Sequence, residues 1–247
     1  MTKILLLTLA LTAVCGTSQA ATTVNAGSIN NVTGPGSVDL TNIVYAVRFS
    51  PDGPQTVNGV TFATDSLPPV GFSSSGPNLL GSWQTKPEFG ATADDNALEE
   101  IYHDIRWTNQ GVFPPEPNLT ASMDVTPGQM YRLQVLIPGN IPENRIWDIQ
   151  VEGTLVVDNI TSLGVDTGSG PPPYSLNRGI LYSYDFLAGD STVNVALGQI
   201  GGAPFPGGPG TDANAIWSGI TLATIVPEPS AAMLAGLAAL GLLRRRR

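Results

Sequence analysis

Short apolar runs separated by turns rich in Gly and Pro dominate the pattern of this chain. The clearest run is Gln129–Ile137, where apolar side chains at every second position would share one face of an extended strand, namely Tyr131, Leu133, Val135 and Ile137. This alternation predicts a strand of a half-buried antiparallel sheet. Runs rich in Val, Ile, Leu and Thr predict further strands at Ile43–Phe49, Val57–Phe62, Arg145–Val151, Thr154–Val157, Leu181–Leu187, Thr192–Leu197 and Ile216–Ile225.

One segment lacks the alternation of apolar and polar residues that predicts a strand. Asp94–Ile101 begins with residues that cap helices, carries carboxylates in its first turn and contains good helix formers, so we expect one or two helical turns there. Its continuation, Tyr102–Trp107, is expected to be a strand. Three tracts rich in Gly, Pro and Ser are expected to be surface loops: Pro68–Gly81, Gly164–Pro173 and Gly198–Gly210.

Composition indicates the same fold class. The 28 glycines and 21 prolines cluster between the apolar runs, as in β-rich domains with many turns. Without its two ends the chain keeps about 205 residues, which is enough for one domain with its own core. The predicted fold class is all-β, an antiparallel β-sandwich with one short helix.

The C-terminal tail has three parts. Pro227, Glu228 and Pro229 come first, and the two prolines impose an extended, accessible backbone. The uncharged segment Ser230–Leu243 follows, shorter than the roughly 20 apolar residues of a usual membrane span. Four arginines end the chain: Arg244, Arg245, Arg246 and Arg247.

This order resembles the tail of PEP-CTERM proteins, exported proteins of Gram-negative bacteria. The resemblance implies a sorting motif at Pro227, Glu228 and Pro229, a C-terminal transmembrane helix, and an arginine cluster that stops at the cytoplasmic surface. It also implies processing by a membrane protease, exosortase. The alternative is a buried C-terminal helix of a soluble domain, although such a helix rarely has an apolar surface all round and then four arginines.

The N-terminus has the features of a secretory signal peptide. Lys3 supplies the positive charge, Ile4–Val14 the apolar helix, and Ser18 and Ala20 the small residues that signal peptidase requires. We expect cleavage after Ala20, with Ala21 as the competing site.

Cys15, the only cysteine, lies inside this predicted signal peptide. A lipoprotein would use it as the acylated first residue, but Val14 stands where such sites prefer Gly, Ala or Ser. The mature chain would contain no cysteine and therefore no disulfide.

Removing both ends makes the charge more negative. The remaining part keeps six basic and nineteen acidic residues, a formal charge of −13 instead of −9. Nucleic acid is excluded as a partner, because its binding depends on neutralising phosphates with cations. An anionic membrane surface or an acidic polysaccharide is disfavoured for the same reason, unless divalent cations bridge the charges.

A second resemblance lies in the middle of the chain. Tyr131–Leu136, Asn144–Gly153 and Val156–Asp158 resemble the paired strands of malectin-like and related galactose-binding-like domains, in which an Arg-aromatic-Asp-aliphatic strand leads to a Gly turn. Ala213–Leu222 resembles their closing strand. The resemblance implies a jelly-roll sandwich. No segment corresponds to a malectin sugar-binding loop, so no ligand residue is transferred.

Candidate catalytic chemistry centres on His103, the only histidine, which excludes sites built from several histidines. Glu99, Glu100 and Asp104 could form a carboxylate–imidazole cluster with it. The competing interpretation is a polar helix-to-strand connection whose carboxylates cap and solvate the backbone. A glycosidase would need only two carboxylates, and nineteen acidic residues leave that alternative open.

A sugar-binding module requires exposed aromatic side chains that stack on sugar rings. The candidate ligand-binding residues are Trp83, Trp107, Tyr174, Tyr182 and Tyr184, of which Tyr182 and Tyr184 share one face of a predicted strand. The alternative is that aromatic residues fill the core, which we expect for Trp147 and Trp217.

No cofactor is predicted and no metal site can be named. Calcium remains a candidate, because many aspartates lie in or near turns, but no Asp-x-Asp-x-Asp-Gly loop exists to specify a site. The aspartates in question are Asp65, Asp94, Asp95, Asp158, Asp166, Asp185, Asp190 and Asp212.

The predicted organisation is a signal peptide at 1–20, a β-sandwich domain at 21–225 and a sorting signal at 226–247. The predicted function is non-catalytic: a cell-surface or extracellular protein with a structural or adhesive role in an exopolysaccharide or biofilm matrix and weak carbohydrate binding. Its partners would be signal peptidase and exosortase during export, with transient anchoring in the inner membrane, and then polysaccharide. The alternative is a secreted carbohydrate-active enzyme.

The mature N-terminus should lie at the predicted cleavage site. Edman degradation or mass spectrometry of the exported protein should find Ala21 or Thr22 as the first residue, because signal peptidase reads the small side chains before that point. A mature chain beginning at a lipid-modified Cys15 would contradict this and establish the lipoprotein alternative.

Overall fold

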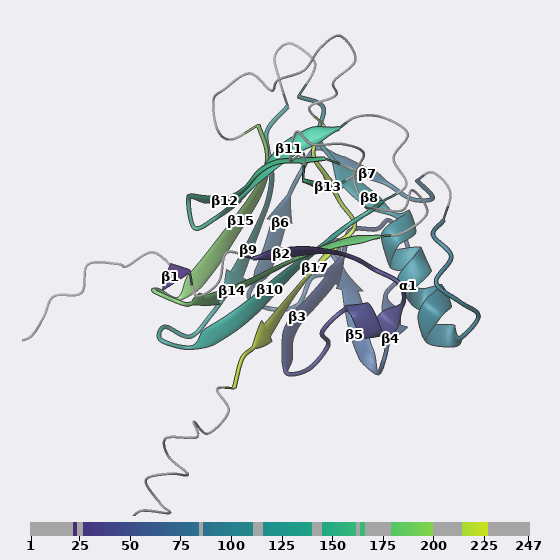
Figure 1. The fold of residues 1–247 in the computed structure, drawn as a ribbon, viewed down its shortest axis with the longest axis horizontal. Helices are drawn as coiled ribbons and strands as arrows, with labels where there is room; N and C mark the ends of the chain where they lie inside the picture. The colour runs from purple at the N-terminus through teal and green to yellow at the C-terminus, as the bar shows by residue number, and fades with distance from the viewer. Residues whose placement is uncertain are drawn as a thin grey trace, which may run out of the picture.

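The computed structural model describes residues 22–23, 27–83, 86–110, 116–139, 145–161, 164–165, 179–199 and 214–226. Within these ranges the protein is mostly β, with one α-helix, α1 (Ala93–His103), and one 3-10 turn, η1 (Pro35–Ser37) (Figure 1). The predicted signal helix and C-terminal transmembrane helix lie outside them. In the described part of the chain, no helix combines the length and apolarity needed to cross a membrane.

The larger sheet is formed by β1 (Thr22–Thr23), β2 (Ser28–Asn31), β3 (Ile43–Arg48), β4 (Gln55–Val57), β5 (Val60–Thr64), β10 (Met130–Ile137), β14 (Ile180–Leu187) and β17 (Gly219–Thr224). Its order is β1-β14-β10-β17-β3-β5-β4, with β2 also pairing with β14. The pairing of β3 with β5 is parallel and the other pairings in this sheet are antiparallel.

The smaller sheet is formed by β6 (Phe72–Ser75), β9 (Leu119–Asp124), β11 (Ile146–Val151), β12 (Thr154–Thr161), β13 (Gly164–Val165) and β15 (Thr192–Gly198). Its order is β13-β12-β11-β15-β9-β6 and its pairings are antiparallel. A side sheet of order β16-β8-β7 joins β7 (Asn78–Leu80), β8 (Ile105–Trp107) and β16 (Ile216–Trp217).

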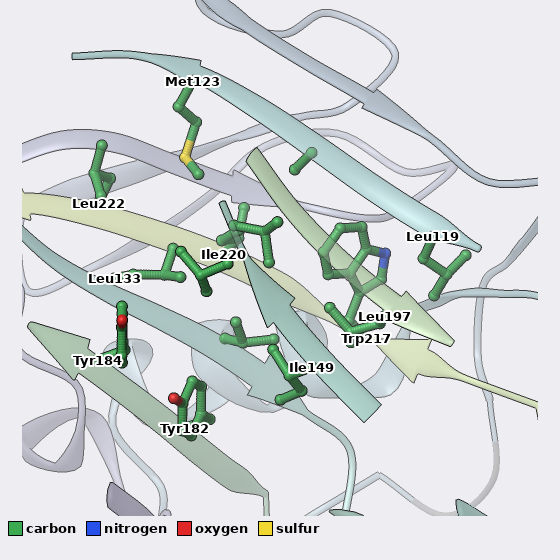
Figure 2. Packing of buried hydrophobic residues seen from close by; sticks show 14 of the residues in the cluster. Leu119, Met123, Leu133, Ile149, Tyr182, Tyr184, Leu197, Trp217, Ile220 and Leu222 are labelled. Atoms are coloured by element: carbon green, nitrogen blue, oxygen red, sulfur yellow. The ribbon is translucent and has the colours of Figure 1, made fainter. Parts of the chain in front are cut away.

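The two large sheets pack face to face as a β-sandwich. Inward-facing residues of both sheets form one core cluster, in which Leu133 of β10 and Ile149 of β11 are fully buried (Figure 2). Trp217 stacks on Phe49 with 4.4 Å between ring centroids. The prediction that Trp147 and Trp217 lie in the core is confirmed, since neither side chain is exposed.

From Leu133 to Ile137 strand β10 is buried on both faces, whereas the sequence predicted a half-buried sheet. Its outer side chain Leu136 belongs to a second core cluster that includes Leu98 and Ile101 of α1. Gln134 is also buried there, and the Thr221 hydroxyl donates a hydrogen bond to its side-chain oxygen (3.4 Å). Helix α1 therefore covers part of the outer face of the larger sheet (Figure 1).

Helix α1 is longer than predicted. It begins after Thr92, whose hydroxyl accepts a hydrogen bond from the Asp95 N–H (3.1 Å), while the Asp95 carboxylate accepts one from the Thr92 N–H (3.0 Å). It continues through His103, and the predicted strand at Tyr102–Trp107 begins only at Ile105. The physical reason is the burial of Tyr102 against the larger sheet, which favours another helical turn.

The predicted loop at Pro68–Gly81 is wrong, because it contains β6 and β7. Both strands gain partners distant in sequence, β9 and β8, whose hydrogen bonds outweigh the weak strand preference of the serines in β6 and of Asn78 in β7. Gly164–Val165 likewise forms β13, and the rest of Gly164–Pro173 lies outside the described residues. Only the first two residues of Gly198–Gly210 are described, and Gly198 ends β15.

A buried ion pair joins α1 to the larger sheet. The Arg48 guanidinium donates to Asp104, and each side chain is almost completely buried. The Ser82 N–H donates to the other Asp104 oxygen (2.8 Å), and Arg48 also donates to the Gly53 carbonyl (2.7 Å). These contacts fix the end of α1 against β3.

Replacing Arg48 should therefore destabilise the fold strongly. Arg48→Met leaves the Asp104 carboxylate buried without its cation and should lower the free energy of unfolding by about 3–5 kcal/mol. The matched control is Lys86→Met, which removes the more exposed pair with Glu100 and should cost about 0–1 kcal/mol. Urea denaturation measures both, and equal losses would contradict the structural role of the buried pair.

Candidate functional site

A pocket of about 360 Å³ opens on the smaller sheet. It is built by strands β6, β9, β15 and β11 together with the turn after β11. We call it the hydroxyl pocket, and its lining comprises Ser73, Ser74, Ser75, Thr120, Ala121, Ser122, Gln150, Gly153, Asn194, Val195 and Ala196.

Strand alternation places the polar side chains of this pocket on the outer face. Leu119, Ala121 and Met123 of β9 are buried between the sheets, so the intervening Thr120 and Ser122 point the other way. The register then aligns them across the sheet in two rows: Ser73, Ser122 and Asn194 in one, and Ser75, Thr120 and Ala196 in the other.

Several polar groups in the hydroxyl pocket are free to bind a ligand. The side chains of Ser73, Ser122 and Asn194 have no hydrogen-bond partner among the described residues. The Gln150 amide donates to the Gly153 carbonyl (2.7 Å), which leaves its side-chain oxygen as an acceptor. None of the described lining residues is charged. The pocket can therefore hydrogen-bond a neutral polar molecule. The Glu152 carboxylate lies beside it and accepts a hydrogen bond from the Asn194 N–H.

Tyr182 and Tyr184 lie in the core, so the prediction that they are exposed stacking platforms is wrong. Their exposed fractions are 1% and 2%, and their rings stack 6.3 Å apart (Figure 2). They do share one face of β14, as predicted, but that face points toward the smaller sheet. Burial raises the pKa of the Tyr182 phenol well above its usual value, so this side chain stays neutral.

The remaining candidate aromatics do not form a common surface with the hydroxyl pocket. Trp83 and Trp107 are partly buried against the main core, and neither lines the pocket. The Arg145 guanidinium lies 5.1 Å from the centre of the Trp83 ring, a cation–π contact. Tyr174 lies outside the described residues.

The carboxylates around His103 have structural partners. Glu100 lies 3.8 Å from the imidazole and accepts a hydrogen bond from Lys86 (2.7 Å), which lowers the pKa of this carboxyl. Glu99 is buried and accepts from the Phe89 N–H (2.7 Å), while Asp104 binds Arg48. The arrangement agrees with the interpretation of a polar helix-to-strand connection.

No calcium site emerges in the described part of the chain, where no three acidic, histidine or cysteine side chains group closely enough to hold a metal. Asp65 and Asp185 pair with Arg106 and Arg132, and Asp95 caps α1. Asp166 and Asp212 lie outside the described residues.

The hydroxyl pocket is not predicted from the sequence, since a loop is expected at β6 and no strand at β9. The missed signal is the alternation of Leu119, Ala121 and Met123 with Thr120 and Ser122. The run Ser73-Ser74-Ser75 looks like an ordinary turn. The signal cleavage residues Ala20 and Ala21, the sorting motif at Pro227, Glu228 and Pro229, and the arginine cluster at 244–247 all lie outside the described residues.

Comparison with known families confirms the assignment of the tail. Residues 226–247 match the model described as the PEP-CTERM protein-sorting motif. The motif marks the protein as exported, sorted to the cell surface and processed by exosortase. No curated protein matches the chain by sequence.

The body is similar in fold to malectin-like ectodomains of plant receptors, as the second resemblance implied. The plant receptor-like kinase ANX2 aligns with a TM-score of 0.53 at 13% identity, over 76% of this chain and 51% of that chain. The ANXUR1 extracellular domain from Arabidopsis thaliana gives 0.50 at 13% identity, over 74% and 49%. The chain thus spans about half the length of these structures, and at this identity the likeness concerns the fold alone.

Processing of the tail should depend on exosortase. A tagged protein should be shortened at its C-terminus and leave the inner membrane in an exosortase-positive strain, and should accumulate uncut in the deletion strain, because the motif is the signal for that enzyme. Cell fractionation followed by immunoblotting measures both. The same full-length product in both strains would contradict the assignment of the tail.

Proposed function

We propose that this protein acts, without catalysis, as a structural or adhesive component of an exopolysaccharide or biofilm matrix, and that it binds uncharged polysaccharide weakly through the hydroxyl pocket. The proposal includes the organisation inferred from the sequence: a signal peptide at 1–20, a galactose-binding-like jelly-roll sandwich at 21–225 and a sorting tail at 226–247. Before the tail is cut, the C-terminal segment anchors the protein transiently in the inner membrane.

The observation that carries this proposal is the chemistry of the hydroxyl pocket. Its free hydroxyl and amide groups match the donors and acceptors of a neutral sugar, and its volume of about 360 Å³ falls within the range of ligand pockets. The lining residues that the structure describes include no aromatic ring to stack on a sugar face. Each hydrogen bond exchanged with water contributes only about 0.5–1.5 kcal/mol, so weak binding is expected.

The charge of the protein supports the same class of ligand. With a formal charge of −13 on residues 21–225, an acidic polysaccharide would be repelled, whereas a neutral one would not. The alternative, a carbohydrate-active enzyme, requires two carboxylates that flank a bound glycan. The described lining of the hydroxyl pocket supplies neither.

Blocking the pocket should abolish binding. The exported protein should bind neutral glycans on an array and release no reducing sugar from them. Ser122→Arg should lose that binding, because the long charged side chain would fill the pocket, while Thr126→Arg, which adds the same charge at an exposed turn, should keep it. Sugar release that a single carboxylate substitution abolishes would support the enzyme instead, and equal binding by both variants would exclude the hydroxyl pocket as the site.

A further inference from the structure

Hydrogen bonds to the folded domain continue along the chain as far as Ile225, the residue before the sorting motif. Strand β17 lies between β10 and β3, so it is a central strand of the larger sheet and not an edge (Figure 1). Thr224, the last residue of β17, donates its N–H to the Asn42 carbonyl (3.0 Å), and the Ile225 N–H beyond the strand still donates to the Met130 carbonyl (2.9 Å). The chain is therefore bound to both neighbouring segments at the point where it leaves the sandwich.

The Gln129 side chain adds hydrogen bonds at the point where the chain leaves the sandwich. Its amide nitrogen donates to the Ile225 carbonyl (3.2 Å) and to the Met130 carbonyl (3.1 Å). Both backbone groups of Ile225 are thus hydrogen-bonded, the N–H to Met130 of β10 and the carbonyl to Gln129 just before it. Val226, which is 68% exposed, is the next residue and also the first residue of the matched motif. No spacer separates the folded body from the sorting signal.

The hydrogen bonds of Ile225 restrict the access of a protease to this part of the chain. Proteases bind substrates as extended segments, and an extended peptide is bound largely through its backbone N–H and C=O groups. Pro227 and Pro229 lack an N–H, so the backbone donors in and beside the motif are few, and Val226 and Ile225 supply those that precede it. The groups of Ile225 are already occupied by β10 and Gln129.

We propose that release of Ile225 from β10 limits cutting of the sorting tail, and that the Gln129 side chain controls this release. The partner is the membrane protease that recognises the motif, and the substrate segment includes Ile225 as well as the motif itself. The inference depends on the sorting assignment and is independent of any glycan bound in the hydroxyl pocket.

The test is pulse–chase processing of the full-length chain in an exosortase-positive strain. A Gly-Ser linker inserted between Ile225 and Val226 supplies a free extended segment and should speed cutting about fivefold or more, the factor expected when one or two hydrogen bonds no longer have to open. Gln129→Met keeps the length of the side chain but loses the donor, and should speed cutting about fivefold. The matched control is the same linker between Leu67 and Pro68, an exposed loop, which should leave the rate unchanged.

The possible results distinguish failure of this proposal from failure of the sorting assignment and of glycan binding. A linker at Ile225 that leaves the cutting rate at the wild-type value, or slows it, would overturn the proposal. If Gln129→Met unfolds the body, as limited proteolysis would reveal, the linker variant alone decides. Absence of cutting in wild type and variants alike would overturn it together with the sorting assignment, whereas loss of glycan binding would affect neither.

Discussion

Strand β10 has no free edge and, from Leu133 to Ile137, no exposed face, and this double burial constrains the rest of the sandwich. It pairs with β14 on one side and β17 on the other, while its two faces pack on the smaller sheet and on the second core cluster with α1. Because side chains alternate between faces, a slip by one residue would bring Gln134 into the main core and remove Leu133 from it. The register of β14 and β17 is therefore fixed by burial, and through β17 so is the point where the chain leaves the body.

The long strands of the larger sheet could be predicted because their own sequences contain the signal. The short β1 and β2 were not predicted, and the expected run Val57–Phe62 is divided by a turn between β4 and β5. Apolar side chains alternate in β10 and β14, and β17 carries an apolar run before the motif. The strands β6 and β7 contain no such signal, and only pairing with partners far along the chain makes them strands. Strand β9 does alternate apolar and polar residues, but over only six positions, and it was not predicted. The residues of its first turn predict helix α1, but its length depends on the burial of Tyr102 against the larger sheet, which the sequence alone does not show.

The same limit applies to the candidate site. Alternation identified the face that Tyr182 and Tyr184 share, but it could not tell whether that face points to solvent or to a second sheet. Aromatic rings suit both environments. The hydroxyl pocket is a harder case, because its rows bring together Ser73, Ser122 and Asn194 from strands widely separated in sequence. A site assembled by cross-strand register becomes visible only when the register is known.

The charge distribution connects the fold with the surface that remains for partners. Every basic side chain of the body that the structure describes has a structural partner: Arg48, Lys86, Arg106 and Arg132 pair with carboxylates, and Arg145 lies over Trp83. The few cations are thus used to hold segments of the fold together, while acidic residues remain in excess. A polymer that approaches this surface gains little from ion pairing and must depend on hydrogen bonds to uncharged groups. The outer face of the smaller sheet, where hydroxyl and amide side chains stand in register and the described pocket lining is uncharged, is suited to that kind of contact.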